Sequence, residues 1–265
     1  MAILKNSIQF TGKLNDLSAY TLKGSDKIIL RTKGGPTRKQ VKKSPAYHNT
    51  RLNNSEFGGS ANGAKHIRMA IYPVKHLADY NFTGPLIALC GAIQKMDPVN
   101  KWGERSVLFS KHSHILAGFQ LNRQNPLDSV IRHPLRTTID RATGTATVQI
   151  PDLYQNLNLF LPWEAPCFRL IASLGVVADR IYNGQDYKDA ATTTSFHTQT
   201  FYTPWQHTQQ SFTATTITLQ LDHPTALQDH HTLILSSGIE MGMPVSDGLI
   251  NRIRHTGSAK IIAVG

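Results

Sequence analysis

The chain is poor in cysteine, in acidic residues and in long apolar runs. Its 265 residues include only two cysteines, Cys90 and Cys167, which stand far apart in apolar surroundings. A disulfide framework and a cysteine-rich zinc site are therefore excluded, and we expect two buried free thiols. No apolar run reaches the roughly 20 residues that a membrane-spanning helix needs, and residues 1–10 lack the apolar core of a signal peptide. We expect the chain to be cytoplasmic as synthesised, with later release or assembly into an extracellular or phage-like structure left open.

The sequence also lacks the motifs of common enzymes. It contains no Gly-x-Ser-x-Gly, no His-Glu-x-x-His and no glycine-rich loop ending in Gly-Lys-Ser/Thr. Its 17 acidic residues are scattered, so no catalytic carboxylate pair is visible. The densest histidine groups, residues 229–231 with His223 and residues 112–114, lack further ligands at metal-binding spacing. We therefore predict a non-enzymatic protein without catalytic residues, metal or cofactor.

Positive charge dominates, but it is confined to one part of the chain. The formal net charge is +11, and it divides into +13 over residues 1–124 and −2 over residues 125–265. Such asymmetry favours contact of the basic part with nucleic acid or with a membrane surface. It equally favours head-to-tail association, in which the basic part of one copy faces the mildly acidic part of the next.

The densest basic segment covers residues 31–43, with Gly-Gly-Pro in its middle to interrupt regular structure. Such a segment could neutralise phosphates without reading bases, or contact a neighbouring copy. The alternative interpretation is a solvated loop followed by a charged helix face. The candidate contact residues are Arg31, Lys33, Arg38, Lys39, Lys42, Lys43, Arg51 and Arg68.

The hydrophobic pattern predicts an α+β chain of two domains. Residues 8–32 read as a small antiparallel β-meander, which is too small to be stable without a partner surface. Helices are expected over residues 37–43, from Pro45, from Ser55 or Ser60, and over residues 85–95. Strands are expected within residues 137–150 as a hairpin and at residues 169–178, 215–221, 232–236 and 259–264. The pattern predicts a strand-plus-helix module over residues 1–127 and an antiparallel Ig-like β-sandwich over residues 128–265.

Two further groups of residues are candidates for special roles. The first is a structural junction. Its amides and its carboxylate are expected to bond exposed backbone or an arginine such as Arg51 or Arg68. Its phenyl ring is expected to anchor in the core, and its glycines to permit a tight turn. Its members are Asn53, Asn54, Glu56, Phe57, Gly58 and Gly59. The second is an aromatic edge within the threonine-rich residues 190–218, where the rings contact a sugar, a surface or a neighbouring copy, or else pack on the sandwich. Its members are Phe196, Phe201, Tyr202 and Trp205.

Several segments resemble a bacterial protein family. They are GKLNDLSAY at 12–20, RTKGGP at 31–36, RLNNSEFGG at 51–59, ADYN at 78–81, GFQLNR at 118–123 and GSAKIIAV at 257–264. Together these segments resemble an uncharacterised family of Bacteroidetes-type proteins. The resemblance covers most of the chain and implies a basic strand-and-helix module joined to a β-sandwich. It supplies no activity and no catalytic residues.

The function predicted first is that of a non-enzymatic structural protein whose partners are copies of itself. The two-part charge, the meander that needs a partner and the aromatic edge favour a repeated head-to-tail contact, which generates a tube or filament when it does not close. Two alternatives remain open at this point. One is nucleic-acid binding by the basic N-terminal strip, and the other is a carbohydrate- or surface-binding β-sandwich that uses the aromatic edge.

Overall fold

The fold is that of two separate compact units. The computed structural model describes residues 2–4, 10–22, 25–32, 34–191, 193, 196–246 and 248–265. Contacts divide the chain into unit 1 (Met1–Arg51) and unit 2 (Leu52–Gly265). The division therefore does not fall at residue 127, where the sequence pattern placed it.

Unit 1 consists of a small sheet and the basic helix. The strands β1 (Ala2–Leu4), β2 (Gly12–Leu14), β3 (Leu17–Thr21) and β4 (Ile28–Thr32) form an antiparallel sheet in the order β1-β4-β3-β2. Helix α1 (Arg38–Lys43) begins at a capping box, in which the Thr37 hydroxyl accepts from the Gln40 backbone and the Gln40 side chain accepts from the Thr37 backbone. A single 3-10 turn, η1 (Pro45–Tyr47), follows α1. The predicted meander and the helix from Thr37 are both present.

A helical layer opens unit 2. Its elements are α2 (His48–Ala70), which starts in unit 1, η2 (Tyr72–Leu77), α3 (Thr83–Lys95), α4 (Phe109–His112), η3 (Ser113–Leu116) and α5 (Leu127–Val130). The prediction of a helix start at Ser55 or Ser60 is wrong, because both residues lie inside the continuous α2. Pro73 stands three residues after the end of α2, within η2, where a proline does not interrupt the helix.

Two antiparallel sheets follow. The larger sheet has the order β10-β7-β13-β14, with β11 also paired to β7, and the smaller has the order β12-β6-β5. Their bounds are β5 (Arg136–Asp140), β6 (Thr145–Ile150), β7 (Cys167–Ala178), β10 (Gln199–Tyr202), β11 (Gln206–His207), β12 (Thr215–Gln220), β13 (His231–Ser246) and β14 (Leu249–Val264). A short hairpin joins β8 (Arg180–Tyr182) to β9 (Tyr187–Asp189), and a single turn, η4 (Pro224–Ala226), precedes β13. The α+β class is confirmed.

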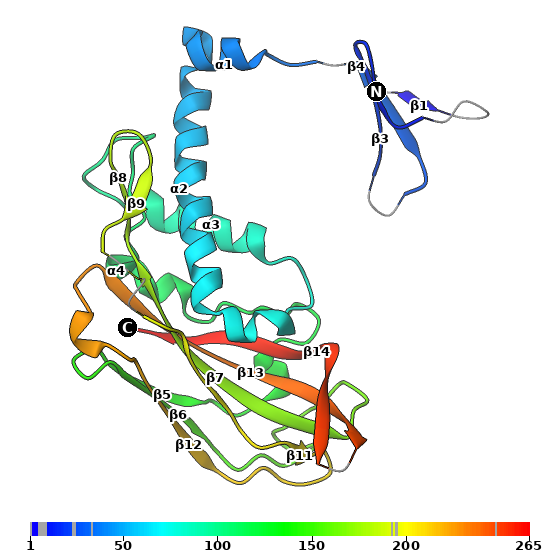
Figure 1. Ribbon diagram of the computed structural model, residues 1–265, viewed down its shortest axis with the longest axis vertical. Coiled ribbons are helices and arrows are strands. Elements are labelled where there is room, and N and C mark those ends of the chain that lie inside the picture. The colour runs from blue at the N-terminus through cyan, green and yellow to red at the C-terminus, as the bar shows by residue number, and fades with distance from the viewer. Residues whose placement is uncertain are drawn as a thin grey trace. The chain divides into compact units, whose positions relative to one another are not determined.

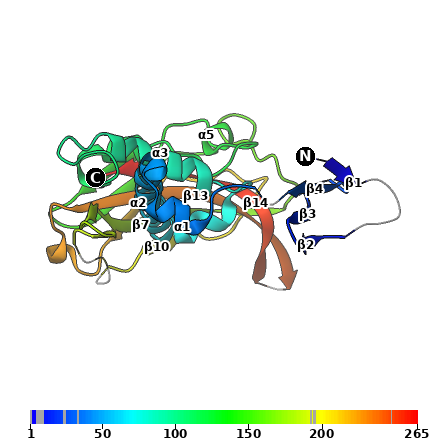
Figure 2. The same ribbon diagram turned by 90° about the horizontal axis from the view of Figure 1, so that it is seen from above.

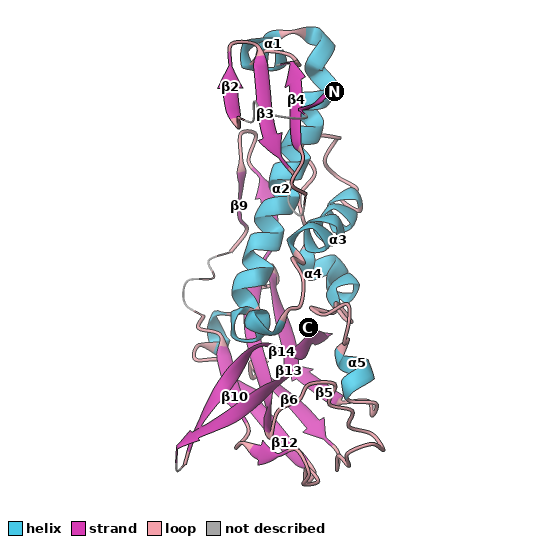
Figure 3. Ribbon diagram, turned by 90° about the vertical axis from the view of Figure 1, so that its right-hand side faces the viewer, coloured by secondary structure: helices cyan, strands magenta, loops and turns pink. Residues whose placement is uncertain are grey.

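The larger sheet is the middle of three layers in unit 2 (Figure 1). Side chains on one face, such as Phe168 and Leu170, pack against the small sheet through Val148. Ile171, on the opposite face, belongs to the cluster that holds helix residues such as Ile67. Because β7 is covered on both faces, its sequence is almost continuously apolar. Figure 3 shows the helices and strands of these layers from the side. Helices and strands share a core, so a boundary at residue 127 would cut through it.

The far end of the β13–β14 hairpin projects beyond the other strands of unit 2 (Figure 2). This hairpin arm, residues 243–246 and 248–255, follows the last buried residue pair of the two strands. Its apolar side chains are exposed, with Met243 at 45 %, Val245 at 61 % and Leu249 at 52 %. None of the helices described is long and apolar enough to cross a membrane.

Candidate functional site

The basic residues of α1 are free of acidic partners among the described residues. Arg38, Lys39, Lys42 and Lys43 are all exposed, and no side chain of α1 is buried. The guanidinium of Arg31 lies 5.3 Å from the centre of the Tyr20 ring, whereas Lys33 falls outside the described residues. The four exposed side chains of α1 make this helix a cationic element of unit 1 that can meet phosphates or carboxylates.

Two of the candidate contact residues, Arg51 and Arg68, lie on α2 and bond to neighbouring groups of the fold instead. Arg51 donates from Nη1 to the carbonyl oxygens of Val41 and Ser44, at 2.9 Å each, and so holds α1 against the start of α2. Arg68 lies in unit 2 and donates to the Thr83 hydroxyl at 3.4 Å. Because both guanidinium groups have hydrogen-bond partners within the fold, they are less available to an outside partner than the cations of α1.

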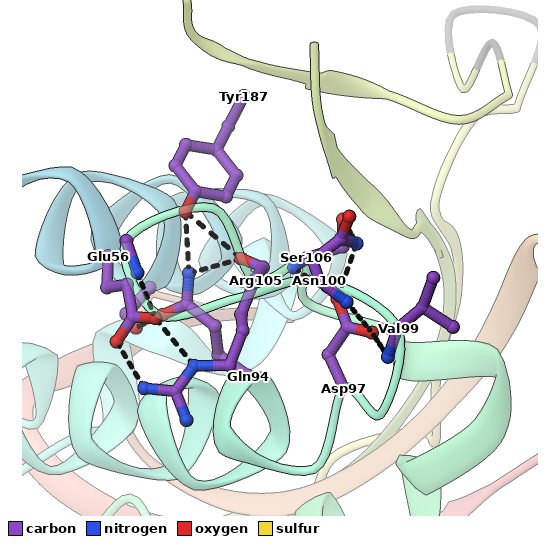
Figure 4. Close-up of polar contacts among 10 residues, drawn as sticks. Glu56, Gln94, Asp97, Val99, Asn100, Arg105, Ser106 and Tyr187 are labelled. Atoms are coloured by element: carbon purple, nitrogen blue, oxygen red, sulfur yellow. Dashed lines mark hydrogen bonds and ion pairs between the residues drawn. The ribbon is translucent and has the colours of Figure 1, made fainter. Parts of the chain in front are cut away.

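Glu56 forms the centre of a buried ionic contact in unit 2 (Figure 4). Its carboxylate accepts two hydrogen bonds from Arg105, at 2.6 and 2.7 Å, and one from the Gly103 backbone at 2.9 Å. Burial disfavours the ionised form, but the bonds from Arg105 and Gly103 outweigh it and hold the pKa of Glu56 below its usual value. The prediction that Arg51 or Arg68 bonds the Glu56 carboxylate is therefore wrong, because Arg105 forms this ion pair.

The same region contains a second set of buried hydrogen bonds. The Gln94 amide donates to the Arg105 carbonyl at 2.8 Å and to the Tyr187 hydroxyl at 2.9 Å. Asp97 accepts hydrogen bonds from the Ser106 backbone at 2.8 Å, from the Val99 backbone and from the Asn100 side chain. These bonds fasten the loop of residues 97–106 to α2, α3 and β9 (Figure 4). The arrangement is structural, since its polar groups satisfy one another.

Most of the other predicted junction residues lie on the solvent face of α2. Phe57 is 62 % exposed, so its expected place in the core is wrong. Gly58 and Gly59 continue the helix and make no turn. The reason is helical periodicity, which turns only every third or fourth residue toward the core. The exposed members are Asn53, Asn54, Phe57 and Gly58.

Gly59 and Gly58 provide a matched test of this packing. A Cβ at Gly59 would lie 2.5 Å from the buried Tyr187 ring, whereas a Cβ at Gly58 meets nothing within 4 Å. We expect Gly59→Ala to lower the free energy of unfolding by about 1–3 kcal/mol through overpacking. Gly58→Ala should raise it by up to about 1 kcal/mol, since alanine favours helix. Urea denaturation followed by circular dichroism measures both, and equal effects of the two substitutions would contradict this account.

The four rings of the predicted aromatic edge do not form one surface. Phe196 packs on the core between the sheets and meets the His231 ring edge-on, with centres 5.1 Å apart. Phe201 and Tyr202 are 42 % and 41 % exposed on β10, the edge strand that pairs with β7. Trp205 is partly buried beside the end of that strand. Packing on the sandwich and solvent exposure therefore both occur within this group.

Tyr202 and Trp205 meet at an ionic centre that the sequence did not indicate. The guanidinium of Arg169 lies 4.3 Å from the centre of the Tyr202 ring and 4.4 Å from that of Trp205. Arg169 also pairs with Glu240, its direct cross-strand neighbour between β7 and β13. His76 completes the centre, since its Nε2 lies 2.7 Å from Glu240 Oε2.

Glu240 is the buried member of this centre, with a side chain that is 1 % exposed. Burial disfavours its charge, but hydrogen bonding by His76 and the charge of Arg169 outweigh burial and hold the pKa of Glu240 below its usual value. A lone acidic residue within the apolar stretch of residues 233–243 was the signal that could have indicated it.

The histidine groups and cysteines singled out by the sequence have ordinary surroundings. Within the described residues, no three histidine, cysteine, aspartate or glutamate side chains are placed to hold a metal ion. Asp179 accepts from the Ser110 hydroxyl at 2.6 Å and lies 3.2 Å from His230 Nδ1. The aspartate thus stands between serine and histidine, whereas a nucleophilic triad places the histidine in the middle. Both cysteines are buried free thiols, and burial raises the pKa of Cys90 to about 12.

Comparison with known proteins gave no match. The chain matches no protein-family model, no curated protein and no solved structure. The resemblance to a bacterial family therefore stays a prediction.

Proposed function

We propose that the protein is a structural subunit that associates head-to-tail with copies of itself into a tube or filament. The observation that carries the proposal is the small core of unit 1. Among its described residues only Ala19, Ile28 and Ile29 are buried apolar side chains, while Leu14 and Leu22 are at least half exposed. A sheet of this size with so little core is marginal in water, and a neighbouring subunit would supply the missing apolar surface.

The two units differ strongly in charge. Unit 1 carries eleven basic and two acidic residues, whereas unit 2 carries 17 basic and 15 acidic residues and is nearly neutral. A contact between unlike parts of two copies is heterologous, and such a contact repeats without limit unless its rotation closes a ring. Attraction between the basic side chains of unit 1 and acidic side chains of unit 2 in the next copy would speed the encounter and fix its polarity.

The hairpin arm is the second surface that supports association. It presents Met243, Val245 and Leu249 to solvent on a projecting pair of strands. Exposed apolar side chains that gather on a protruding element are typical of contact sites between proteins. We infer that the arm docks on the next subunit, where these side chains become buried.

Substitution on the arm tests the proposal. We expect the full chain to form ordered polymers, visible by negative-stain electron microscopy and as large species in light scattering after size exclusion. Val245→Asp and Leu249→Asp should each raise the concentration needed for assembly roughly 10- to 100-fold, because burial of such a side chain contributes about 1.5–3 kcal/mol. The matched control is Leu157→Asp, which changes a 71 % exposed leucine of unit 2 outside the arm.

A wild-type chain that stays monomeric at low and at physiological salt would contradict the proposal. So would equal loss of assembly in Leu157→Asp and the two arm variants. Nucleic-acid binding through the exposed cations of α1 stays the alternative prediction. A monomeric chain whose binding to labelled duplex DNA weakens steeply with salt would favour that alternative.

A further inference from the structure

A groove in unit 2 lies between η2 and residues of β10 and β14, the two outer strands of the larger sheet. Its volume is about 310 Å³, which is the lower end of the range for small-ligand sites. Three elements contribute to it, since η2 supplies four residues, β10 one and β14 one. The lining residues are Tyr72, Pro73, Lys75, His76, Tyr202 and Arg252.

The groove is cationic. Lys75 and Arg252 have no ion-pair partner among the described residues, and none of the six lining residues is acidic. The nearest carboxylate of the ionic centre, Glu240, is buried, paired with Arg169 and hydrogen-bonded to His76. Two unpaired cations that converge on one concave site favour an anion, and phosphate in particular.

The walls of the groove are held in place by that same centre. Glu240 binds Nε2 of His76 at 2.7 Å and so fixes the imidazole ring at the rim. Arg169 stacks on the Tyr202 ring and is itself fixed by Glu240. A site whose side chains are already ordered loses little conformational entropy when a ligand binds.

Aromatic rings flank the cations. Tyr72 is 71 % exposed and Tyr202 is 41 % exposed. Exposed rings next to unpaired lysine and arginine are the combination on which proteins stack the bases of nucleotides while the cations hold the phosphate. A simple inorganic anion would not need the rings, and a neutral sugar would not need the cations.

We propose that this groove binds a nucleotide, with its phosphate at Lys75 and Arg252 and its base against the tyrosines. The proposal goes beyond self-association and does not depend on it. The shared chemistry is a phosphate linked to a flat base, and its source is either a free mononucleotide or the phosphorylated end of an oligonucleotide.

The test is isothermal titration of the full-length chain with adenosine monophosphate, inorganic phosphate, adenosine and a 5′-phosphorylated oligonucleotide. We expect binding of the nucleotide to be tighter than that of phosphate or adenosine alone. Lys75→Ala and Arg252→Ala should each weaken it at least roughly tenfold, because each removes a charge-assisted contact. Both side chains are exposed, so these variants should fold. The matched control is Lys111→Ala, an exposed lysine on α4 outside the groove.

The outcomes separate clearly. Tighter binding of the mononucleotide or of the oligonucleotide supports the site and identifies its source. Absence of nucleotide binding, equal binding of phosphate alone, or nucleotide binding that Lys75→Ala and Arg252→Ala leave unchanged would overturn the proposal. Because Arg252 lies on the hairpin arm, the titrations are made below the concentration at which the chain polymerises, so that docking of the arm does not cover the groove.

Discussion

Glu240→Ala is expected to lower the free energy of unfolding by about 3–5 kcal/mol, the usual cost of removing one partner from a buried ion pair. The substitution leaves Arg169 and His76 facing an empty space where the carboxylate accepted their hydrogen bonds. Arg169 cannot turn to solvent freely, because it is stacked against Tyr202 and Trp205. Urea denaturation followed by circular dichroism measures the change.

A surface pair serves as the control for Glu240→Ala. Lys101 and Glu104 form an ion pair at 3.4 Å with a lysine side chain that is 79 % exposed, so Glu104→Ala should cost at most about 1 kcal/mol. The double variant Arg169→Met/Glu240→Met should lose less free energy of unfolding than the two single variants lose together. The reason is that it leaves no uncompensated charge between these two positions. A loss below about 1 kcal/mol in Glu240→Ala would show that the buried contact contributes little.

The second large effect is expected on acidification and depends on His66. Burial, together with the positive charges of Arg180 and Lys65, lowers the pKa of His66 from 6.5 to about 4. Between these two pH values the unfolded chain takes up a proton that the folded chain refuses. The stability that neutral His66 contributes is thus present above pH 6.5 and is lost as the pH falls toward 4, by at most about 3 kcal/mol in all, because solvent around a half-buried ring screens the effect.

This pH dependence can be separated from that of the carboxylates. The pKa values of Glu56, Asp97 and Glu240 are lowered, so their contributions are present above their unfolded pKa values and are lost only below about pH 4.5. His66 therefore contributes to the slope of stability between about pH 5 and 6.5, beside the other histidines of the chain. His66→Gln should flatten it, whereas His207→Gln, at an exposed position, should not. An unchanged slope in His66→Gln would refute the assignment.

The secondary structure was largely predictable because its signals are local. Thr37 with Gln40 marks a helix start, and the alternation of residues 145–150 marks a strand. The long helix α2 was harder to predict, since Gly58 and Gly59 resemble a break. Gly59 is explained only by the Tyr187 ring packed against it, and that ring comes from a strand distant in sequence. The packing of the helices on the larger sheet was not predicted either. Apolar periodicity does not say which face of a sheet another element will cover.

The candidate sites depend still more on distant contacts. Arg169 and Glu240 are 71 residues apart, and only the register of β7 against β13 makes them neighbours. The groove adds η2 from a third part of the chain. Composition did identify Tyr202, Trp205 and the cations of α1 as unusual, but composition alone could not place Phe57 on the outer face of a helix.

The shared core of unit 2 also has a consequence for synthesis in the cell. Helix residues such as Ile67 and Leu86 pack against Ile234, Ala259 and Ile261, which lie on the last two strands. At ordinary translation rates, the roughly 140 residues that follow Leu121 take about 10–30 s to make. Throughout that interval the nascent helices have no sheet on which to bury their apolar faces. The chain should therefore depend on chaperones during translation, and it should commit to its fold only when β14 has left the ribosome.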